Sequence, residues 1–179
     1  MKRAMHAAPA EVLIAQKIVV RPATSGDLES IRCIYNEGIE DRIATLDSDA
    51  KSSDEIAQWW SAHGGRFSIL IATNGERVIG WASLNPFTGR CAHADVADLS
   101  VYVARDLRGS GVGFALLKSL IADAAVEGFH KVVLHALDFN EHGKRLYRKA
   151  GFVEVGVFKE HGLIDGRYAD VIAMERLLA

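Results

Sequence analysis

Apolar residues recur along the chain with two different periods, and these periods predict an alternation of strands and helices. Across residues 28–39 they return every three or four positions, as on the buried face of an amphipathic helix. Thr24 with Asp27, and Ser52 with Glu55, have the spacing of capping boxes, which satisfy free amides at the start of a helix. We therefore expect two consecutive helices in the first third of the chain.

Shorter runs rich in β-branched and aromatic residues predict strands. The dipeptide Asn74-Gly75, which lies between two such runs, is typical of a tight hairpin. The expected strands are residues 18–21, 67–73, 77–84, 96–103, 131–137, 152–157 and 169–177. Two further helices are predicted, one over residues 112–126 and one from Asn140 to Gly151, and residues 85–95 are expected to form a loop.

The resulting order, β-α-α-β-β-β-α-β-α-β-β, mixes hairpins with strand–helix–strand units. It predicts an α/β fold in which helices flank a central mixed, twisted sheet. The length of 179 residues suits one domain, expected over residues 17–179. Residues 1–16 begin with basic residues like a signal peptide, but His6 and Pro9 interrupt the apolar stretch, and we expect a flexible tail there.

Composition narrows the class of protein. With 49% hydrophobic and 25% charged residues, the chain has the make-up of a soluble globular protein. A net charge of −2 provides no basic surface for nucleic acid, and no apolar run reaches the ~20 residues that a membrane helix needs. Cys33 and Cys91 lack the CxxC spacing, which favours a reducing compartment, so we expect a cytoplasmic protein.

The most informative segment joins the strand at 96–103 to the helix at 112–126. Backbone amides in such a turn converge on one point, the helix N-terminus adds positive dipole, and an arginine adds charge-assisted hydrogen bonds. These features predict a pyrophosphate site at Arg108, Gly109, Ser110, Gly111, Val112 and Gly113. A P-loop would need Gly-Lys-Ser/Thr, and a dinucleotide fingerprint would need a third glycine where Leu116 stands. The plain alternative is a glycine-rich helix start without a ligand.

The spacing Arg108-x-x-Gly111-x-Gly113 resembles the (Q/R)-x-x-G-x-(G/A) signature of the GNAT superfamily of acyl-CoA-dependent N-acetyltransferases. Residues 140–152, which read NEHGKRLYRKAGF, look like the later helix of that superfamily, with its tyrosine and its Gly-Phe ending. The order of elements is also similar from Ile18 onward. This resemblance implies a GNAT-like acyl-CoA N-acyltransferase fold with acetyl-CoA as the co-substrate.

Other segments are similar to the phosphinothricin acetyltransferase-like branch of the superfamily. They are RPAT at 21–24, NPF at 85–87, VADLSVYV at 96–103 and GRYAD at 166–170, together with Arg90. Members of this branch acetylate small amino acids and their analogues. The resemblance therefore implies transfer of acetyl to the primary amine of a small molecule, either an amino acid or an analogue like phosphinothricin or methionine sulfoximine. It also implies a homodimer.

The resemblance implies two catalytic groups. Asp98 occupies the place of a carboxylate that assists deprotonation of the amine, where the family usually has glutamate. Because aspartate is one methylene shorter, it would act directly or through a water molecule. Tyr147 matches a tyrosine that protonates the departing thiolate. A solvated or salt-bridged aspartate and a half-buried tyrosine that only packs are the alternatives.

The resemblance also implies contacts to acetyl-CoA and to the amine. The backbone at Leu99, Val101 and Val103 would pair with the pantetheine arm like an added strand, and Asn140 would contact CoA unless it is only a helix N-cap.

Arg90 would hold an acidic group of the substrate near His93 and residues 37–46, unless it is a solvated loop arginine. His93 stands where the branch tends to have tyrosine, and this difference bears on the choice of substrate.

The remaining signals are weaker. Seven histidines are present without HExxH, HxH or a Cys/His cluster, so we predict no metal site and regard His130 and His135 as solvated or core side chains. Trp59-Trp60 would line a pocket or pack one ring into the core. Two other functions stay open at this point, namely acetylation of protein N-termini or lysines and a non-catalytic acyl-CoA sensor. A closed pocket would favour a small-molecule substrate, and an open groove would favour peptides.

Overall fold

The computed structural model describes residues 17–178, and the tail predicted at residues 1–16 lies outside them. In chain order the elements are β1 (Ile18–Pro22), η1 (Ser25–Asp27), α2 (Leu28–Glu40), α3 (Ser53–Ala62), β2 (Ile69–Asn74), β3 (Arg77–Pro86), η2 (Cys91–His93), β4 (Val96–Val103), η3 (Arg105–Leu107), α4 (Val112–Val126), β5 (Lys131–Leu137), α5 (Glu141–Lys149), β6 (Val153–Ile164) and β7 (Arg167–Leu177). The three η elements are single turns of 3-10 helix. The predicted order of strands and helices is confirmed.

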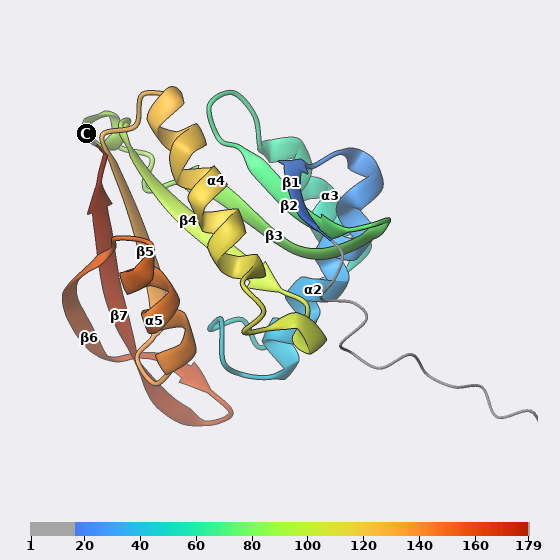
Figure 1. Ribbon diagram of the computed structural model, residues 1–179. Coiled ribbons are helices and arrows are strands. Elements are labelled where there is room, and N and C mark those ends of the chain that lie inside the picture. The colour runs from blue at the N-terminus through green and yellow to red at the C-terminus, as the bar shows by residue number, and fades with distance from the viewer. Residues whose placement is uncertain (1–16, 179) are drawn as a thin grey trace, which may run out of the picture.

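The described strands form one seven-stranded sheet in the order β1-β2-β3-β4-β5-β7-β6. Within it β4 and β5 pair in parallel, and the other neighbours pair antiparallel. Figure 1 shows α4 crossing one face of the sheet and α2 and α3 lying behind the other. This mixed α/β architecture confirms the predicted fold class.

The period-two alternation of the central strands divides the core between these two faces. Leu70 and Ala72 of β2 pack with α4, whereas Ile69 and Ile71 of the same strand pack with α2 and α3. Trp81 of β3 joins the second cluster, together with Tyr35 and Tyr102. Each helix layer therefore has its own apolar cluster, and β4 lies between the two.

Two segments differ from the sequence-based expectation. The last two strands form a longer hairpin than expected, and a turn at Asp165 and Gly166, which both have positive φ, connects them. Most of β6 is exposed and its pairing is interrupted at two register shifts, so the alternating pattern that marks a strand is weak there. The expected loop at residues 85–95 is shorter, because β3 continues to Pro86 and a 3-10 turn forms at Cys91–His93.

Within residues 17–178, none of the helices combines the length and the apolar character needed to cross a membrane.

Candidate active site

The candidate site begins where β4 and β5 separate. Their parallel pairing covers only the three positions from Val96 to Asp98 on β4 and from Lys131 to Val133 on β5. Both strands continue for several residues beyond that point, β4 as far as Val103. Past Asp98, the side of β4 that faces β5 therefore has no strand partner within the described residues. Figure 1 shows the two ribbons diverging toward α5 and the start of α4.

The glycine turn lies at the end of this open stretch of β4. Gly109 and Gly111 have φ values of +81° and +94°, a region that favours glycine. Gly111 is the N-cap residue of α4, with no side chain bonded to the free amides. Among residues 17–178, the amides of Gly111, Val112 and Gly113 have no acceptor, whereas Ser110 donates both its amide and its hydroxyl to the Leu107 carbonyl. The turn thus presents unpaired N–H groups at a helix N-terminus, as an anion site requires.

The guanidinium of Arg108 is bound by other groups of the protein, so it is not free to bind an anion at the glycine turn. Its Nη1 lies 2.5 Å from Oδ2 of Asp41, and its Nε donates to the Val103 carbonyl at 3.2 Å. Arg105 also binds Asp41, with Nη2 2.8 Å from Oδ1, and its amide donates to Glu37. The pKa of Asp41 is lowered, first by Arg105 and also by Arg108. Asp41 follows α2 directly, so these ion pairs join the α2 helix to the turn, a link that the sequence did not predict.

Asp98 lies at the last paired position of β4 and is partly exposed. His135 of β5 approaches it, with 3.4 Å between His135 Nδ1 and Asp98 Oδ1. This contact raises the pKa of His135, and burial opposes the shift. His135 is exposed, as expected for a solvated histidine, but its ring is also paired with the candidate catalytic carboxylate, which the sequence did not predict.

Tyr147 lies on α5 and packs against the α4-side cluster, half-buried. Its hydroxyl has no hydrogen-bond partner in the part of the chain that the structure describes. Burial raises the pKa of Tyr147 well above its ordinary value, and the charges of Tyr102 and Asp98 add to the shift. The phenol therefore stays protonated at neutral pH and lies within electrostatic range of Asp98, as a proton donor near the carboxylate needs.

The remaining predicted residues lie around this centre. Asn140 is the N-cap of α5, and its Oδ1 accepts from the Gly143 amide at 2.9 Å.

Arg90 is exposed at the start of the 3-10 turn, and its guanidinium has no partner among residues 17–178. His93 is half-buried, 2.7 Å from the Thr88 hydroxyl through Nδ1 and edge-on to Phe87. These last groups belong to the loop that leads into β4, so they lie at the Asp98 end of the strand.

A cavity of about 290 Å³ opens on the α2 and α3 face of the sheet. Four aromatic rings line it and contact one another edge-on or stacked: Tyr35, Trp59, Trp81 and Tyr102. Ser100 also lines it, two positions along β4 from Asp98 and on the same face, and Asn85 donates to its hydroxyl at 3.3 Å. The cavity therefore lies beside Asp98 on the face that this carboxylate shares.

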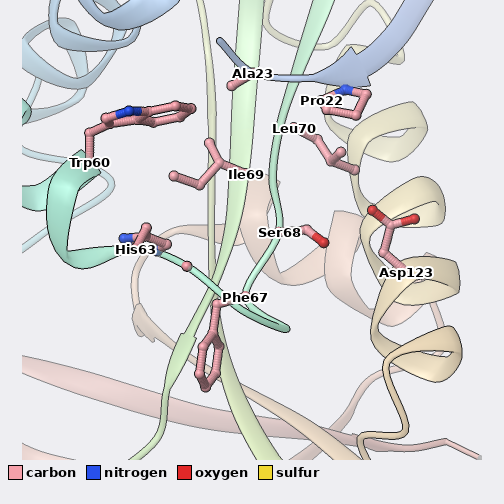
Figure 2. Close-up of a pocket in the computed structure, with 10 residues that line it drawn as sticks. Pro22, Ala23, Trp60, His63, Phe67, Ser68, Ile69, Leu70 and Asp123 are labelled. Atoms are coloured by element: carbon pink, nitrogen blue, oxygen red, sulfur yellow. The ribbon is translucent and has the colours of Figure 1, made fainter. Parts of the chain in front are cut away.

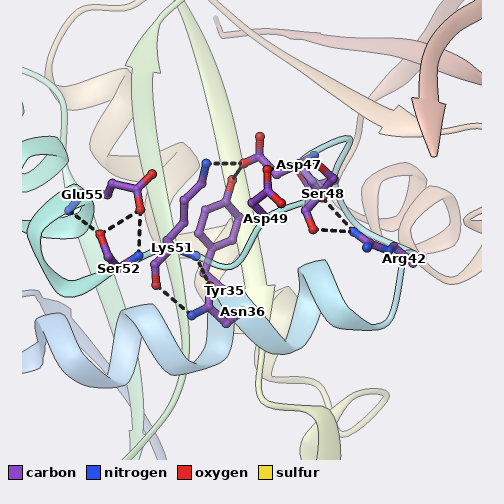
Figure 3. A network of polar contacts seen from close by, with 10 residues as sticks. Tyr35, Asn36, Arg42, Asp47, Ser48, Asp49, Lys51, Ser52 and Glu55 are labelled. Carbon is purple, nitrogen blue, oxygen red and sulfur yellow. Dashed lines mark hydrogen bonds and ion pairs between the residues drawn. The ribbon is translucent and has the colours of Figure 1, made fainter. Parts of the chain in front are cut away.

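The segment between α2 and α3 lies beside this cavity and is fixed by polar contacts (Figure 3). Tyr35 donates its hydroxyl to Asp47 at 2.5 Å, and burial, together with this bond, raises the pKa of Tyr35 to about 12. Asn36 bonds both the amide and the carbonyl of Lys51. At its other side the segment contacts β6, where a side chain at Gly162 would collide with Leu46. The segment is thus anchored to both α2 and the β6–β7 hairpin.

A second cavity, of about 340 Å³, lies at the β1 edge of the sheet (Figure 2). Trp60, His63 and Asp123 are among its lining residues, and none of the predicted site residues lines it. Adjacent tryptophans on α3 thus face different cavities, Trp59 the one beside Asp98 and Trp60 the one at the sheet edge. Although it is larger, the second cavity is lined by neither of the candidate catalytic residues, Asp98 and Tyr147.

Two features of the structure show that the glycine turn and β4 suit a CoA thioester. The unpaired amides at Gly111, Val112 and Gly113 provide the donors that a pyrophosphate needs, and open space surrounds Gly111. The unpaired side of β4 runs from this turn back to Asp98, about 17 Å at the rise of a strand, and offers backbone groups to an extended arm. Acetyl-CoA, when bound there, would supply the activated acetyl group. Within residues 17–178, no three His, Cys, Asp or Glu side chains gather as metal ligands.

A diverging parallel strand pair, a helix start with unpaired amides and a carboxylate paired with a histidine form an arrangement that suits an acetyl-CoA-dependent N-acetyltransferase. A model of the acetyltransferase (GNAT) family matches residues 31–152. A phosphinothricin N-acetyltransferase of Streptomyces coelicolor is 31% identical over 166 residues, which cover 90% of this chain and 97% of that protein.

Solved structures agree with this match. A phosphinothricin acetyltransferase from Sinorhizobium meliloti, in complex with acetyl-CoA, has a TM-score of 0.86 and 30% identity, covering 90% of this chain and 89% of that one. A ribosomal-protein-alanine N-acetyltransferase from Brucella melitensis has a TM-score of 0.85 and 32% identity, covering 89% of this chain and 99% of that one. The chain belongs to the acetyltransferase (GNAT) family.

Proposed function

We propose that the protein transfers acetyl from acetyl-CoA to the amine of a small amino acid or amino-acid analogue. The observation that carries this proposal is the cavity beside Asp98. Its volume of about 290 Å³ is at the small end of ligand pockets and suits an amino acid better than a polypeptide. The relatives named as phosphinothricin acetyltransferases support the same class of substrate.

In this proposal each predicted residue has one task. Asp98 assists removal of a proton from the substrate ammonium, and Tyr147 gives a proton to the departing sulfur. The free amides of Gly111, Val112 and Gly113 hold the pyrophosphate, while the backbone at Leu99, Val101 and Val103 pairs with the pantetheine arm. Asn140 keeps its amide nitrogen available for CoA, because only its oxygen is used in the cap.

The unpaired guanidinium of Arg90 suits a carboxylate or phosphinate on the acceptor, and His93 lies in the same loop. The order of these groups along β4 supports a substrate that enters from the loop before the strand. The CoA carrier would then reach the same point from the glycine turn at the other end.

A homodimer in the cytoplasm completes the proposal. The β6–β7 hairpin exposes large apolar side chains at Val153, Val155, Phe158, Leu163 and Tyr168, which a second copy of the chain would cover. Light scattering after size exclusion tests this, since a monomer at micromolar concentration would contradict it. The two exposed free cysteines, Cys33 and Cys91, support a reducing compartment.

The main rival is a protein acetyltransferase, favoured by the similarity to a ribosomal-protein-alanine N-acetyltransferase. The acyl-CoA sensor is disfavoured, because the matching family model and the similar S. coelicolor protein are named as acetyltransferases. Thiol release from acetyl-CoA separates the two substrate classes when phosphinothricin, methionine sulfoximine and the common L-amino acids are compared with a peptide that begins with alanine. Turnover of free amino acids or analogues supports the proposal, and turnover of the peptide alone contradicts it.

Trp59→Ala and Trp60→Ala provide a matched pair of variants, because only Trp59 lines the cavity beside Asp98. We expect Trp59→Ala to raise KM for the amine at least tenfold, through loss of a buried aromatic contact, and to leave KM for acetyl-CoA unchanged. Trp60→Ala should change neither constant by more than about twofold. Equal effects of the two variants would show that the amine does not use this cavity.

A further inference from the structure

The separation of β4 and β5 brings a carboxylate and an imidazole together. Asp98 is the last residue of β4 that pairs with β5, and its partner there is Val133. Residues opposite each other in a parallel pair point to the same face, and so does every second residue along a strand. His135, two positions after Val133, therefore shares its face with Asp98. The strands diverge just beyond, which leaves room next to the imidazole for a third group.

The imidazole is held on two sides. Its Nδ1 lies 3.4 Å from Asp98 Oδ1, and the ring of Phe158 on β6 lies 6.2 Å from it, centroid to centroid. The Nε2 atom has no partner among residues 17–178. The His135 side chain is 41% exposed and that of Asp98 is 29% exposed, so the histidine is the more accessible of the two. Only the unpaired nitrogen is therefore available to a molecule entering the site.

This arrangement matches the chemistry that amine transfer needs. An ammonium must lose a proton before its nitrogen can attack, and a base that titrates near neutral pH accepts that proton better than a carboxylate does. A carboxylate at one nitrogen of an imidazole fixes the tautomer, stabilises the imidazolium that forms, and leaves the other nitrogen as the acceptor. The pairing with Asp98 moves the pKa of His135 upward, in the direction that strengthens such a base.

We propose that His135 Nε2 accepts the proton from the substrate ammonium, and that Asp98 is a positioning residue that holds the imidazole through Nδ1. This inference rests on the proposed function. In it, the His135 side chain takes the place of the water molecule that would otherwise lie between Asp98 and the amine. It also accounts for the shorter aspartate at position 98, because a longer carboxylate is not needed when an imidazole extends its reach.

The proton and electron balance of the step is complete. One N–H bond of the ammonium breaks, and its proton moves to Nε2. The freed electron pair forms the amide bond to the acetyl carbon, while the carbon–sulfur bond breaks and its electrons leave on sulfur. The sulfur takes one proton, supplied in the proposed mechanism by Tyr147, and the second proton lost by the nitrogen restores that phenol. The proton on His135 passes to solvent.

Other charged groups near His135 affect the pH dependence. From β4 only Asp98 is charged and faces the ring, and from β6 His161 stacks on Phe158, with 4.8 Å between ring centroids. On β7, Glu175 stands opposite Val133 and is paired with Lys131. Tyr147 on α5 stays neutral at these pH values. The acid limb of the rate profile should therefore report mainly the Asp98–His135 pair.

The test compares kcat/KM against pH for wild type, His135→Gln, Asp98→Asn and the control His130→Gln, with the best amine from the substrate screen. His130 is an exposed histidine that lies just before β5, outside the pair. We expect His135→Gln to lower kcat/KM by roughly 10²–10⁴-fold, to abolish the acid limb and to leave CoA affinity unchanged. The control should stay within about twofold of wild type. His135→Ala should regain activity when imidazole is added.

A second readout needs neither substrate nor turnover. In an NMR titration of the free enzyme, the His135 ring should titrate at higher pH in wild type than in Asp98→Asn. The proposal is overturned if His135→Gln keeps the activity and the acid limb of wild type, or if Asp98→Asn leaves the His135 titration unmoved. Failure of wild type to acetylate any free amino acid would instead contradict the proposed substrate class, and the titration would still test the pair.

Discussion

Gly111→Ala perturbs the feature on which cofactor binding depends, the backbone of the glycine turn. Gly111 has a φ of +94°, and a Cβ added there would have no atom within 4 Å. The substitution therefore causes no collision, and its cost comes from the backbone conformation alone. For a residue with a side chain that cost is ~1–2 kcal/mol. In a chain of this size it corresponds to a fall in melting temperature of ~2–8 °C.

Gly64→Ala is the matched control, because Gly64 is exposed, has no positive φ, and also has no atom within 4 Å of an added Cβ. Thermal unfolding of both variants separates backbone strain from the loss of a glycine as such. Calorimetric titration with CoA should show roughly tenfold weaker binding to Gly111→Ala, because relief of the strain moves the amides of Val112 and Gly113. If Gly111→Ala melts and binds CoA like Gly64→Ala, the reasoning about this turn is refuted.

Three further predictions concern packing, pH and charge. Gly80→Ala would bring a Cβ within 2.9 Å of the Tyr102 carbonyl, so we expect a loss of ~1–3 kcal/mol in chemical denaturation. The second prediction concerns Asp27, which is paired with Arg21. The hydrogen bond from Arg21 is the main cause that lowers the pKa of Asp27 to about 2, so this carboxylate stabilises the fold above about pH 4. As pH falls toward 2, wild type should lose up to ~2 kcal/mol that Asp27→Asn does not, measured by urea denaturation at each pH. Asp41→Asn frees Arg108 and should raise CoA affinity roughly 2–5-fold at low salt; weaker binding would show that Asp41 orients the turn instead.

Local chemistry explains what could be predicted from the sequence. The β4 strand was predicted with its observed bounds, since a β-branched run ends there in a glycine turn. The start of α4 followed from the same turn, and the start of α3 from its capping box at Ser52. The β6–β7 turn also carried a signal, Asp165-Gly166, a pair typical of tight hairpins. The first half of β6 was predicted as a strand, but residues 158–164 before the turn gave no strand pattern.

The missed parts of the candidate site depend on partners far apart in the sequence. Asp41 and Arg108 are separated by 67 positions, and their ion pair exists only because the end of α2 packs beside the turn. His135 meets Asp98 only because β4 and β5 are parallel neighbours with Asp98 opposite Val133. A parallel register cannot be read from residue types. With that register assumed, the shared face of Asp98 and His135 would have been the signal.

The period of a single strand organises the whole site. Ser100 and Tyr102 of β4 line the acceptor cavity, and Asp98 shares their face, whereas Leu99 and Val101 pack into the cluster beneath α4. Between these two sets the backbone of β4 is unpaired on the side toward β5 and ends at the glycine turn. The acid–base groups and the cofactor contacts are thus separated by the alternation of side chains and backbone, and they do not compete for space. A one-residue slip of β4 would turn Asp98 toward the core, which is why its long antiparallel pairing with β3 is as necessary to the chemistry as the reacting groups are.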